Sequence, residues 1–125
     1  GGSKRLFHFG AAKPKRLCVT EAAIDALSLA AIETTQSANL SETLYVSTGG
    51  GWSPNTDALL HIYVQTPGLH LIAATDRNRQ GEIYAGRLRH IAEEAGCRFS
   101  RLLPEHEDWN EDLKALPQAA GKTKN

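Results

Sequence analysis

The chain has 125 residues, of which 41% are hydrophobic and 22% charged, a balance typical of one globular domain. Its 14 basic and 14 acidic residues cancel, so net charge gives no argument for a nucleic-acid or membrane partner. The apolar runs are shorter than the ~20 residues of a membrane-spanning helix, and we see no leader pattern that would indicate secretion. The two cysteines are too few for a disulfide framework or a four-cysteine zinc site. We therefore expect a reduced, cytoplasmic protein with no membrane partner.

The charges are segregated along the chain despite this balance. The first 16 residues hold five basic and no acidic residues, whereas residues 105–112 hold five acidic ones. Such segregation can mark a basic face for phosphate groups, although a solvated surface is the more common explanation.

The first predicted elements are a strand and a helix. Residues 16–20 form a short apolar run that is typical of a buried strand. Residues 22–32 are rich in alanine and leucine, and Ile24, Leu27 and Ala31 recur at helical spacing. Thr20 is the expected N-cap of this helix.

Three further strands alternate with two helices. The pattern predicts strands over residues 43–47, 69–74 and 97–103. The first helix between them begins at Ser53-Pro54 and ends at about residue 65. The second covers residues 82–95 and ends at Gly96. This order predicts an α/β fold of about four mainly parallel strands flanked by about three helices. We expect a single Rossmann-like domain over residues 14–116, with a basic N-terminal tail at 1–13 and a C-terminal tail at 117–125.

Candidate functional residues follow the strands at their carboxyl ends, where ligands gather in open parallel sheets. These residues are Glu21, the glycines Gly49, Gly50 and Gly51, Asp76 and Asp108. Carboxylates are hard ligands suited to Mg2+, and glycine amides can bind an anion. The combination is typical of phosphate chemistry.

Each candidate also has a structural explanation. Glu21 in a first helical turn favours the helix dipole, and the glycines can form a simple turn. Asp25 can cap the helix, pair with a basic residue such as Arg77, or join the outer shell of a metal.

Two tryptophans and an aspartate leave similar alternatives open. Trp52 can stack a base or pack on the sheet. Trp109 is expected to pack, with Asp108 either in a metal's outer shell or as the cap of a last short turn.

Four segments together resemble the motifs of Toprim domains, in the family's order, over about residues 14–116. Residues 17–29 resemble the first motif, in which a strand ends in a glutamate, here Glu21. Thr48-Gly-Gly-Gly51 is similar to the small glycine motif, and residues 74–82 look like the DxD motif of type IA topoisomerases. Asp108-Trp-Asn110 resembles the "DWN" element of Toprim-like domains in plasmid and phage primase and mobilisation proteins.

The resemblance implies a set of roles for these residues. Glu21 would act as general acid/base in making or breaking phosphodiester bonds and would bind metal, with Asp76 and Asn78 as further metal ligands. The outer-shell residues would be Asp25, Glu82 and Asp108. From their own chemistry, Gly49, Gly50 and Gly51 are candidates for phosphate binding, and Arg77 and Arg79 either bind nucleic-acid phosphate or lie in a solvated loop. The implied cofactor is Mg2+, or Mn2+ in its place, and the implied partners are nucleic acid, above all single-stranded DNA, and other domains of a parent protein.

The chain departs from the family pattern at three positions. The second acid of DxD is Asn78, a further acid of the topoisomerase form is Gln80, and the glycine after the motif glutamate is Ala22. Because Mg2+ binding by a few carboxylates depends on their number, we expect weak metal binding.

Three hypotheses follow. The first is the Toprim domain of a larger primase, helicase or mobilisation protein, an Mg2+-dependent nucleotidyltransferase or nuclease if active. The second is a degenerate, non-catalytic Toprim module that binds single-stranded nucleic acid or a protein. The third is a nucleotide-binding regulatory domain that uses the glycine run for phosphate.

Overall fold

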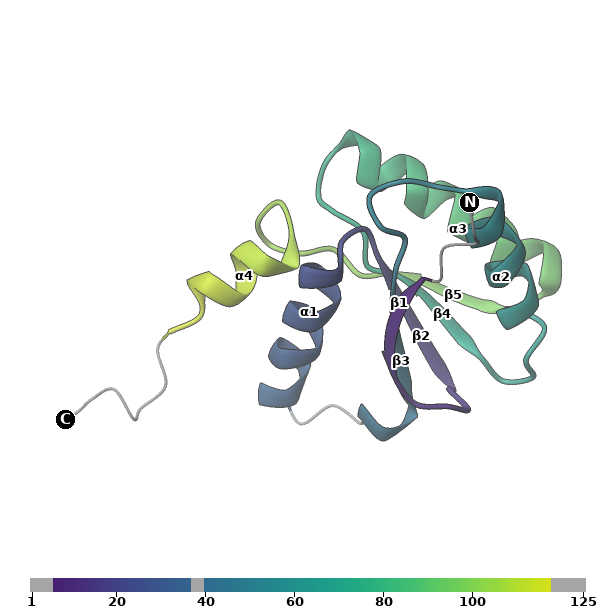
Figure 1. Ribbon diagram of the computed structural model, residues 1–125, viewed down its shortest axis with the longest axis horizontal. Helices are drawn as coiled ribbons and strands as arrows, with labels where there is room; N and C mark the ends of the chain where they lie inside the picture. Colours follow the sequence, from purple (N-terminus) through teal and green to yellow (C-terminus); the bar gives the residue numbers. More distant parts are fainter. Residues whose placement is uncertain (1–5, 37–39, 118–125) are drawn as a thin grey trace.

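The computed structural model describes residues 6–36 and 40–117. A five-stranded sheet, in the order β1-β3-β2-β4-β5, forms its centre (Figure 1). The parallel strands are β2 (Arg16–Thr20), β3 (Thr43–Ser47), β4 (His70–Ala73) and β5 (Arg98–Arg101). The predicted α/β fold with a mainly parallel sheet is thereby confirmed.

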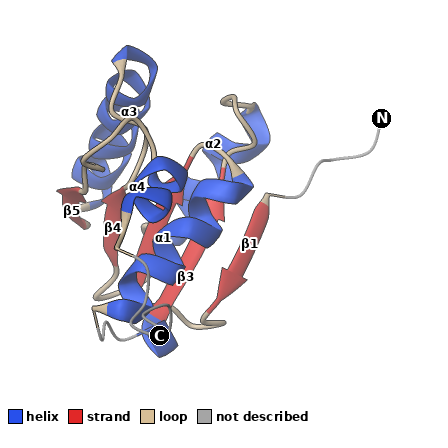
Figure 2. Cartoon of the chain, turned by 90° about the vertical axis from the view of Figure 1, so that its left-hand side faces the viewer, coloured by secondary structure: helices blue, strands red, loops and turns tan. Residues whose placement is uncertain are grey.

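Helices cover both faces of the sheet (Figure 2). One face packs against α1 (Ala23–Thr35) and α4 (Trp109–Ala115), and the other against α2 (Pro54–Tyr63) and α3 (Arg79–Ala95). Side chains alternate along β2, so that Leu17 and Val19 join the core under α2 and α3 while Cys18 joins the core under α1.

Three elements were not predicted from the sequence. Strand β1 (Phe7–Gly10) pairs antiparallel with β3 inside the segment expected to be a basic tail. Its side chains are mostly exposed, so it lacks the apolar pattern of a buried strand, and it is held by the sheet edge and by a stack of Phe9 on Tyr45. The other two are the short 3-10 helix η1 (Leu40–Glu42) and α4, where the sequence indicated only a short turn capped by Asp108 as one alternative.

Helix α1 differs in detail from its prediction. It begins at Ala23 with Ala22 as N-cap and no side-chain capping bond, so the prediction of Thr20 as the cap is wrong. The Thr20 hydroxyl instead donates to the Val46 carbonyl at 3.0 Å, which ties β2 to β3. Ile24 and Leu27, whose spacing indicated the helix, are 53% and 49% exposed, because α1 buries the adjacent face through Ala26 and Leu29.

The remaining helices begin at side-chain caps. Ser53 Oγ accepts from Thr56 N at 3.1 Å and Pro54 occupies the first turn of α2, as predicted. Asn78 caps α3, which therefore starts three residues before the predicted position, and Gly96 ends it at a φ of 69°. Asp108 caps α4.

Parts of the two predicted tails lie outside the described residues. These parts are residues 1–5, with Lys4 and Arg5, of the N-terminal tail and residues 118–125 of the C-terminal tail. Within residues 6–36 and 40–117, no helix combines the length and apolarity that a membrane span requires.

Candidate metal centre

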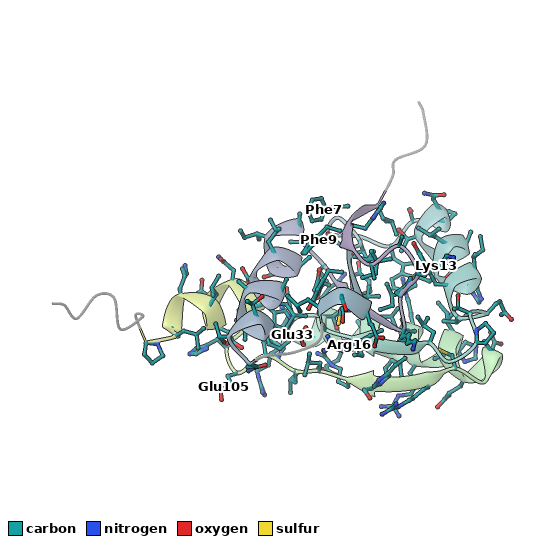
Figure 3. All side chains as sticks on the ribbon, turned by 90° about the horizontal axis from the view of Figure 1, so that it is seen from below. Phe7, Phe9, Lys13, Arg16, Glu33 and Glu105 are labelled. Carbon is teal, nitrogen blue, oxygen red and sulfur yellow. The ribbon has the colours of Figure 1, made fainter. Side chains whose placement is uncertain are left out.

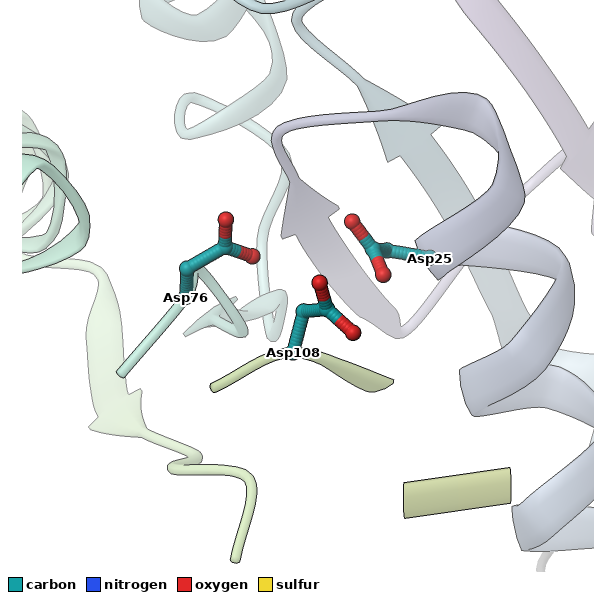
Figure 4. A group of neighbouring side chains, drawn as sticks. All are labelled: Asp25, Asp76 and Asp108. Atoms are coloured by element: carbon teal, nitrogen blue, oxygen red, sulfur yellow. The ribbon is translucent and has the colours of Figure 1, made fainter. Parts of the chain in front are cut away.

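Three aspartates converge at the carboxyl edge of the parallel strands. Asp25 lies in the first turn of α1, Asp76 follows β4, and Asp108 caps α4 (Figure 4). One carboxylate oxygen from each lies within 4.8 Å of the others. Three segments far apart in sequence thus bring three hard oxygen donors to one point.

Asp76 is held through its backbone. Its N–H donates to Glu21 Oε2 at 2.9 Å, which places the buried Glu21 carboxylate beside it. Its carbonyl accepts from Arg101 Nη2 at 2.9 Å. On the other side, a Cβ built on Gly81 would lie 1.9 Å from the same carbonyl, so only glycine allows the first turn of α3 to approach this closely.

Asp108 is held by the loop between β5 and α4. Its Oδ1 accepts from Glu111 N at 2.8 Å as the helix cap. Asp112, one turn into α4, accepts from the backbone amides of Glu105 and His106 at 2.8 and 2.7 Å and so folds the loop back on the helix.

Asp25 connects α1 to α4. Its Oδ1 accepts from Asn110 N at 3.2 Å, and its side chain is almost completely buried. The sequence therefore positions all three aspartates through backbone hydrogen bonds, and not through ion pairs of their carboxylates with basic side chains.

The cluster carries uncompensated negative charge. Burial raises the pKa of Asp25, an effect that the Asn110 amide partly offsets and that the Asp108 and Glu21 charges increase. Burial, together with the charges of Glu21, Asp25 and Asp108, raises the pKa of Asp76 to about 7. Among the described residues, no basic side chain forms an ion pair with any of the three aspartates.

The residues present fit a divalent cation. Asp76 Oδ1 is buried and has no hydrogen-bond partner in the described structure, although buried carboxylate oxygens normally have one. A hard cation such as Mg2+ would supply the missing partner and offset the repulsion between the carboxylates. Asp25, Asp76 and Asp108 are the residues that could hold it, with Glu21 beside Asp76.

Two predicted site residues take part in other contacts. Asn78, expected to be a metal ligand, accepts from Gly81 N through Oδ1 at 2.8 Å and donates to Glu107 Oε2 at 3.0 Å. Glu82, expected in the outer shell, pairs with Arg101 at 2.7 Å, which lowers the pKa of Glu82. Neither belongs to the group of three carboxylates, and their roles toward a metal stay predictions.

The glycine loop points two of its amides into the protein. Gly50 N donates to the Glu21 carbonyl at 2.6 Å, and Gly49 N donates to Ser47 Oγ at 3.1 Å. Both glycines have positive φ angles, 80° and 87°, so the loop needs glycine to fold over Glu21. Gly51 lines an adjoining cavity, and phosphate binding by the loop remains a prediction.

The two predicted phosphate-binding arginines lie beside the centre. Arg77 Nε donates to the Pro104 carbonyl at 2.7 Å, so this side chain braces the loop that carries Asp108. Arg79 is exposed at the first residue of α3.

Arg101 is a positioning residue that the sequence analysis did not identify. Its guanidinium donates to the carbonyls of Ala73, Thr75 and Asp76 at 3.1, 2.8 and 2.9 Å, and thereby fixes the end of β4. Its place at the carboxyl end of β5, in register with Ala73, is the signal that could have found it.

Comparison with known proteins identifies one family. A sequence profile described as Toprim-like matches residues 18–113, which include all three aspartates and Glu21. No curated protein and no solved structure matches significantly.

Proposed function

The chain belongs to the Toprim-like family of nucleic-acid-processing, metal-binding domains, and on that basis we propose that it binds Mg2+ at Asp25, Asp76 and Asp108 and acts on phosphodiester bonds. The observation that carries the proposal is the convergence of three carboxylates with no compensating cation among the described residues. Mn2+, which also prefers oxygen ligands, is the expected substitute.

The residues divide the work in the proposed reaction. Bound Mg2+ would supply charge neutralisation for phosphate oxygens. Glu21 uses Oε2 to accept the Asp76 amide, which leaves Oε1 to take or give a proton at the reacting oxygen. Arg101 and Gly81 fix the Asp76 backbone, so the ligand carboxylate stays in place without a cation.

We further propose that the domain works on single-stranded DNA within a larger primase-, helicase- or mobilisation-type protein in the cytoplasm. The support is the similarity of the four sequence segments to Toprim motifs of such proteins, and the exposed Arg79 near the centre.

A labelled single-stranded oligonucleotide incubated with Mg2+ or Mn2+ tests this function, with cleavage and primer extension as readouts. We expect metal-dependent product from the wild type and a loss on the order of a hundredfold or more in Glu21→Gln, since general acid/base groups contribute about 10²–10⁴. Glu94→Gln, an exposed acid paired with His90 on α3, is the matched control and should retain full activity. Product that persists in EDTA or in Glu21→Gln would contradict the assigned chemistry.

A second candidate function is a non-catalytic Toprim module that binds a single strand or a protein. The observation in its favour is Asn78, which stands where the family has an acid and is engaged as the α3 cap. Restoring the acids with Asn78→Asp and Gln80→Glu separates the two candidates. A gain of activity from an inactive wild type would identify a degenerate site, whereas unchanged metal affinity in both variants would remove these positions from the metal site.

A further inference from the structure

A second hollow lies at the same edge of the sheet, next to the carboxyl end of β3. Its volume is about 490 Å3, and its walls include Phe7 of β1, Ala23 of α1, Thr48, and Trp52, Ser53 and Thr56 at the start of α2. None of the three aspartates lines it. A volume of this size falls in the range of small-ligand pockets, about 300–1,000 Å3. We call it the Trp52 cleft.

The Trp52 ring is held from several sides. Its Nε1–H donates to Asp57 Oδ1 at 3.1 Å, the Tyr84 ring lies 5.6 Å away, and the Arg87 guanidinium lies 5.5 Å from its centroid. The ring is nevertheless only half-buried. A side chain fixed in this way loses little conformational entropy when a flat ligand stacks on it.

The cleft also offers polar groups. Thr48 Oγ1 is buried and has no hydrogen-bond partner among the described residues. The hydroxyls of Ser53 and Thr56 also belong to the wall, but they hydrogen-bond to each other at 3.1 Å and Ser53 caps α2, so Thr48 is the group left without a partner. Arg87 does not line the cleft itself but lines an adjoining hollow that shares Trp52 and Ser53 with it. A ligand that spans the two therefore needs a flat apolar face, a polar edge and a negative charge, and a nucleotide combines all three.

We propose that the Trp52 cleft binds a nucleobase, stacked on Trp52 with its phosphate toward Arg87. The proposal rests on the proposed function, because it names where the strand is gripped beside the acidic centre. One loop joins the two places: Gly50 N donates to the Glu21 carbonyl, and Trp52 follows two residues later. A strand with one base in the cleft would continue along the sheet edge toward Asp76.

Equilibrium binding of an oligothymidylate of about eight nucleotides tests the cleft, a length within single-strand site sizes. EDTA keeps the metal centre out of the measurement. We expect Trp52→Leu to weaken binding on the order of tenfold and Trp52→Phe to stay within about threefold, because stacking needs an aromatic face. Phe99→Leu is the matched control: Arg89 lies 5.3 Å from that ring on the β5 edge, and binding should not change.

A measurement on the unmodified protein covers the case in which Trp52→Leu fails to fold. The chain has two tryptophans, and the Trp109 indole is buried with its Nε1 donating to the Ala74 carbonyl at 2.8 Å. The Trp52 indole N–H resonance should shift on addition of the oligonucleotide while that of Trp109 stays in place. Thymidine monophosphate in a parallel titration distinguishes a free nucleotide from a strand as the source of the base.

The outcomes separate this inference from the proposed function. If the oligonucleotide binds, but Trp52→Leu does not weaken the binding and the Trp52 indole resonance does not shift, the base site in the cleft is overturned and the proposed function is not. No binding of either ligand by the wild type overturns the cleft and the single-strand partner, while the metal centre still has its own test. Equal weakening by Trp52→Phe and Trp52→Leu would overturn stacking as the mode of recognition.

Discussion

Helix α1 carries one buried acid near each end, and the protein treats the two in opposite ways. Glu33 and Asp25 are 5% and 4% exposed. Glu33 accepts hydrogen bonds from both terminal nitrogens of Arg16, at 2.7 and 2.5 Å (Figure 3). It also accepts a hydrogen bond from the Tyr45 hydroxyl. Asp25 faces two further carboxylates and accepts one backbone N–H. The contrast is the one that the proposed metal centre requires: Glu33 is compensated by side chains of this protein, and Asp25 is not.

The compensated end shows what a structural acid requires. The hydrogen bond to Glu33 raises the pKa of Arg16. Burial, and to a smaller extent the hydrogen bond to Glu33, raises the pKa of Tyr45. Burial also raises the pKa of the neighbouring Cys18 thiol to about 12. Arg16, one of the five basic residues near the N-terminus, therefore serves the core rather than a nucleic-acid surface.

Removing the cation from the compensated end should have the largest effect. Arg16→Met leaves Glu33 buried without its ion partner, and breaking such a pair costs about 3–5 kcal/mol. Urea unfolding measures this loss. Adding Glu33→Leu should restore most of the stability, and a loss below about 1 kcal/mol in the single variant would mean that solvent already compensates Glu33.

Crowding the backbone at the acidic end should have the next largest effect. In Gly81→Ala the new Cβ meets the Asp76 carbonyl, and overpacking of this kind costs about 1–3 kcal/mol. Gly86→Ala in the same helix is the matched control, because its Cβ meets nothing within 4 Å. That control should gain about 0.5–1 kcal/mol by helix propensity, so equal effects of the two changes would contradict the close approach.

Neutralising one acid of the cluster should stabilise the metal-free protein. Asp25→Asn removes repulsion from Asp76 and Asp108, and we expect a gain of about 1 kcal/mol in EDTA, as is common when a strained site is relieved. The same variant should lose the rise in melting temperature that Mg2+ gives the wild type. Glu94→Gln should behave as the wild type in both buffers, and a destabilised Asp25→Asn would show that the Asn110 contact outweighs the repulsion.

A further expected effect is the pH dependence of the metal-free protein. The pKa of Asp76 is about 7 in the folded protein, against an ordinary value of 3.8. At a pH between these two pKa values, folding is therefore coupled to the uptake of a proton by Asp76. The free energy of unfolding should therefore fall as pH rises through this window and level off above it. Asp76→Asn should remove this slope, which thermal melts from acid to neutral pH in EDTA would show; an equal slope in the variant would assign the titration to another group.

The sequence predicted the fold well because its strongest signals are local. Apolar runs marked the four parallel strands, and Ser53-Pro54 and Gly96 marked helix ends by their capping chemistry. Strand β1 escaped because pairing with β3, not its own pattern, makes it a strand. The exposed stripe of Ile24 and Leu27 shows that helical spacing reveals a helix but not which face it buries.

The sequence singled out the residues of the candidate centre but did not indicate their arrangement, since it placed Asp25 and Asp108 only in the outer shell of a metal. Strand ends pointed to Glu21 and Asp76, and the similarity to Toprim motifs pointed to Asp25 and Asp108. Their convergence depends on α4 packing against α1 through the Asp25–Asn110 contact, which joins residues 85 positions apart. Asn78 as a cap and Arg101 as a brace likewise depend on tertiary contacts that no local pattern encodes.

The most direct test of the account is a Mg2+ titration followed by amide NMR, with Asp76→Asn as the control. We expect saturable shifts that cluster at Glu21, Asp25, Asp76 and Asp108 in the wild type, leave Arg16 and Glu33 unmoved, and vanish in the variant. A flat titration of the wild type, or shifts that persist in Asp76→Asn, would contradict a metal centre at the three aspartates.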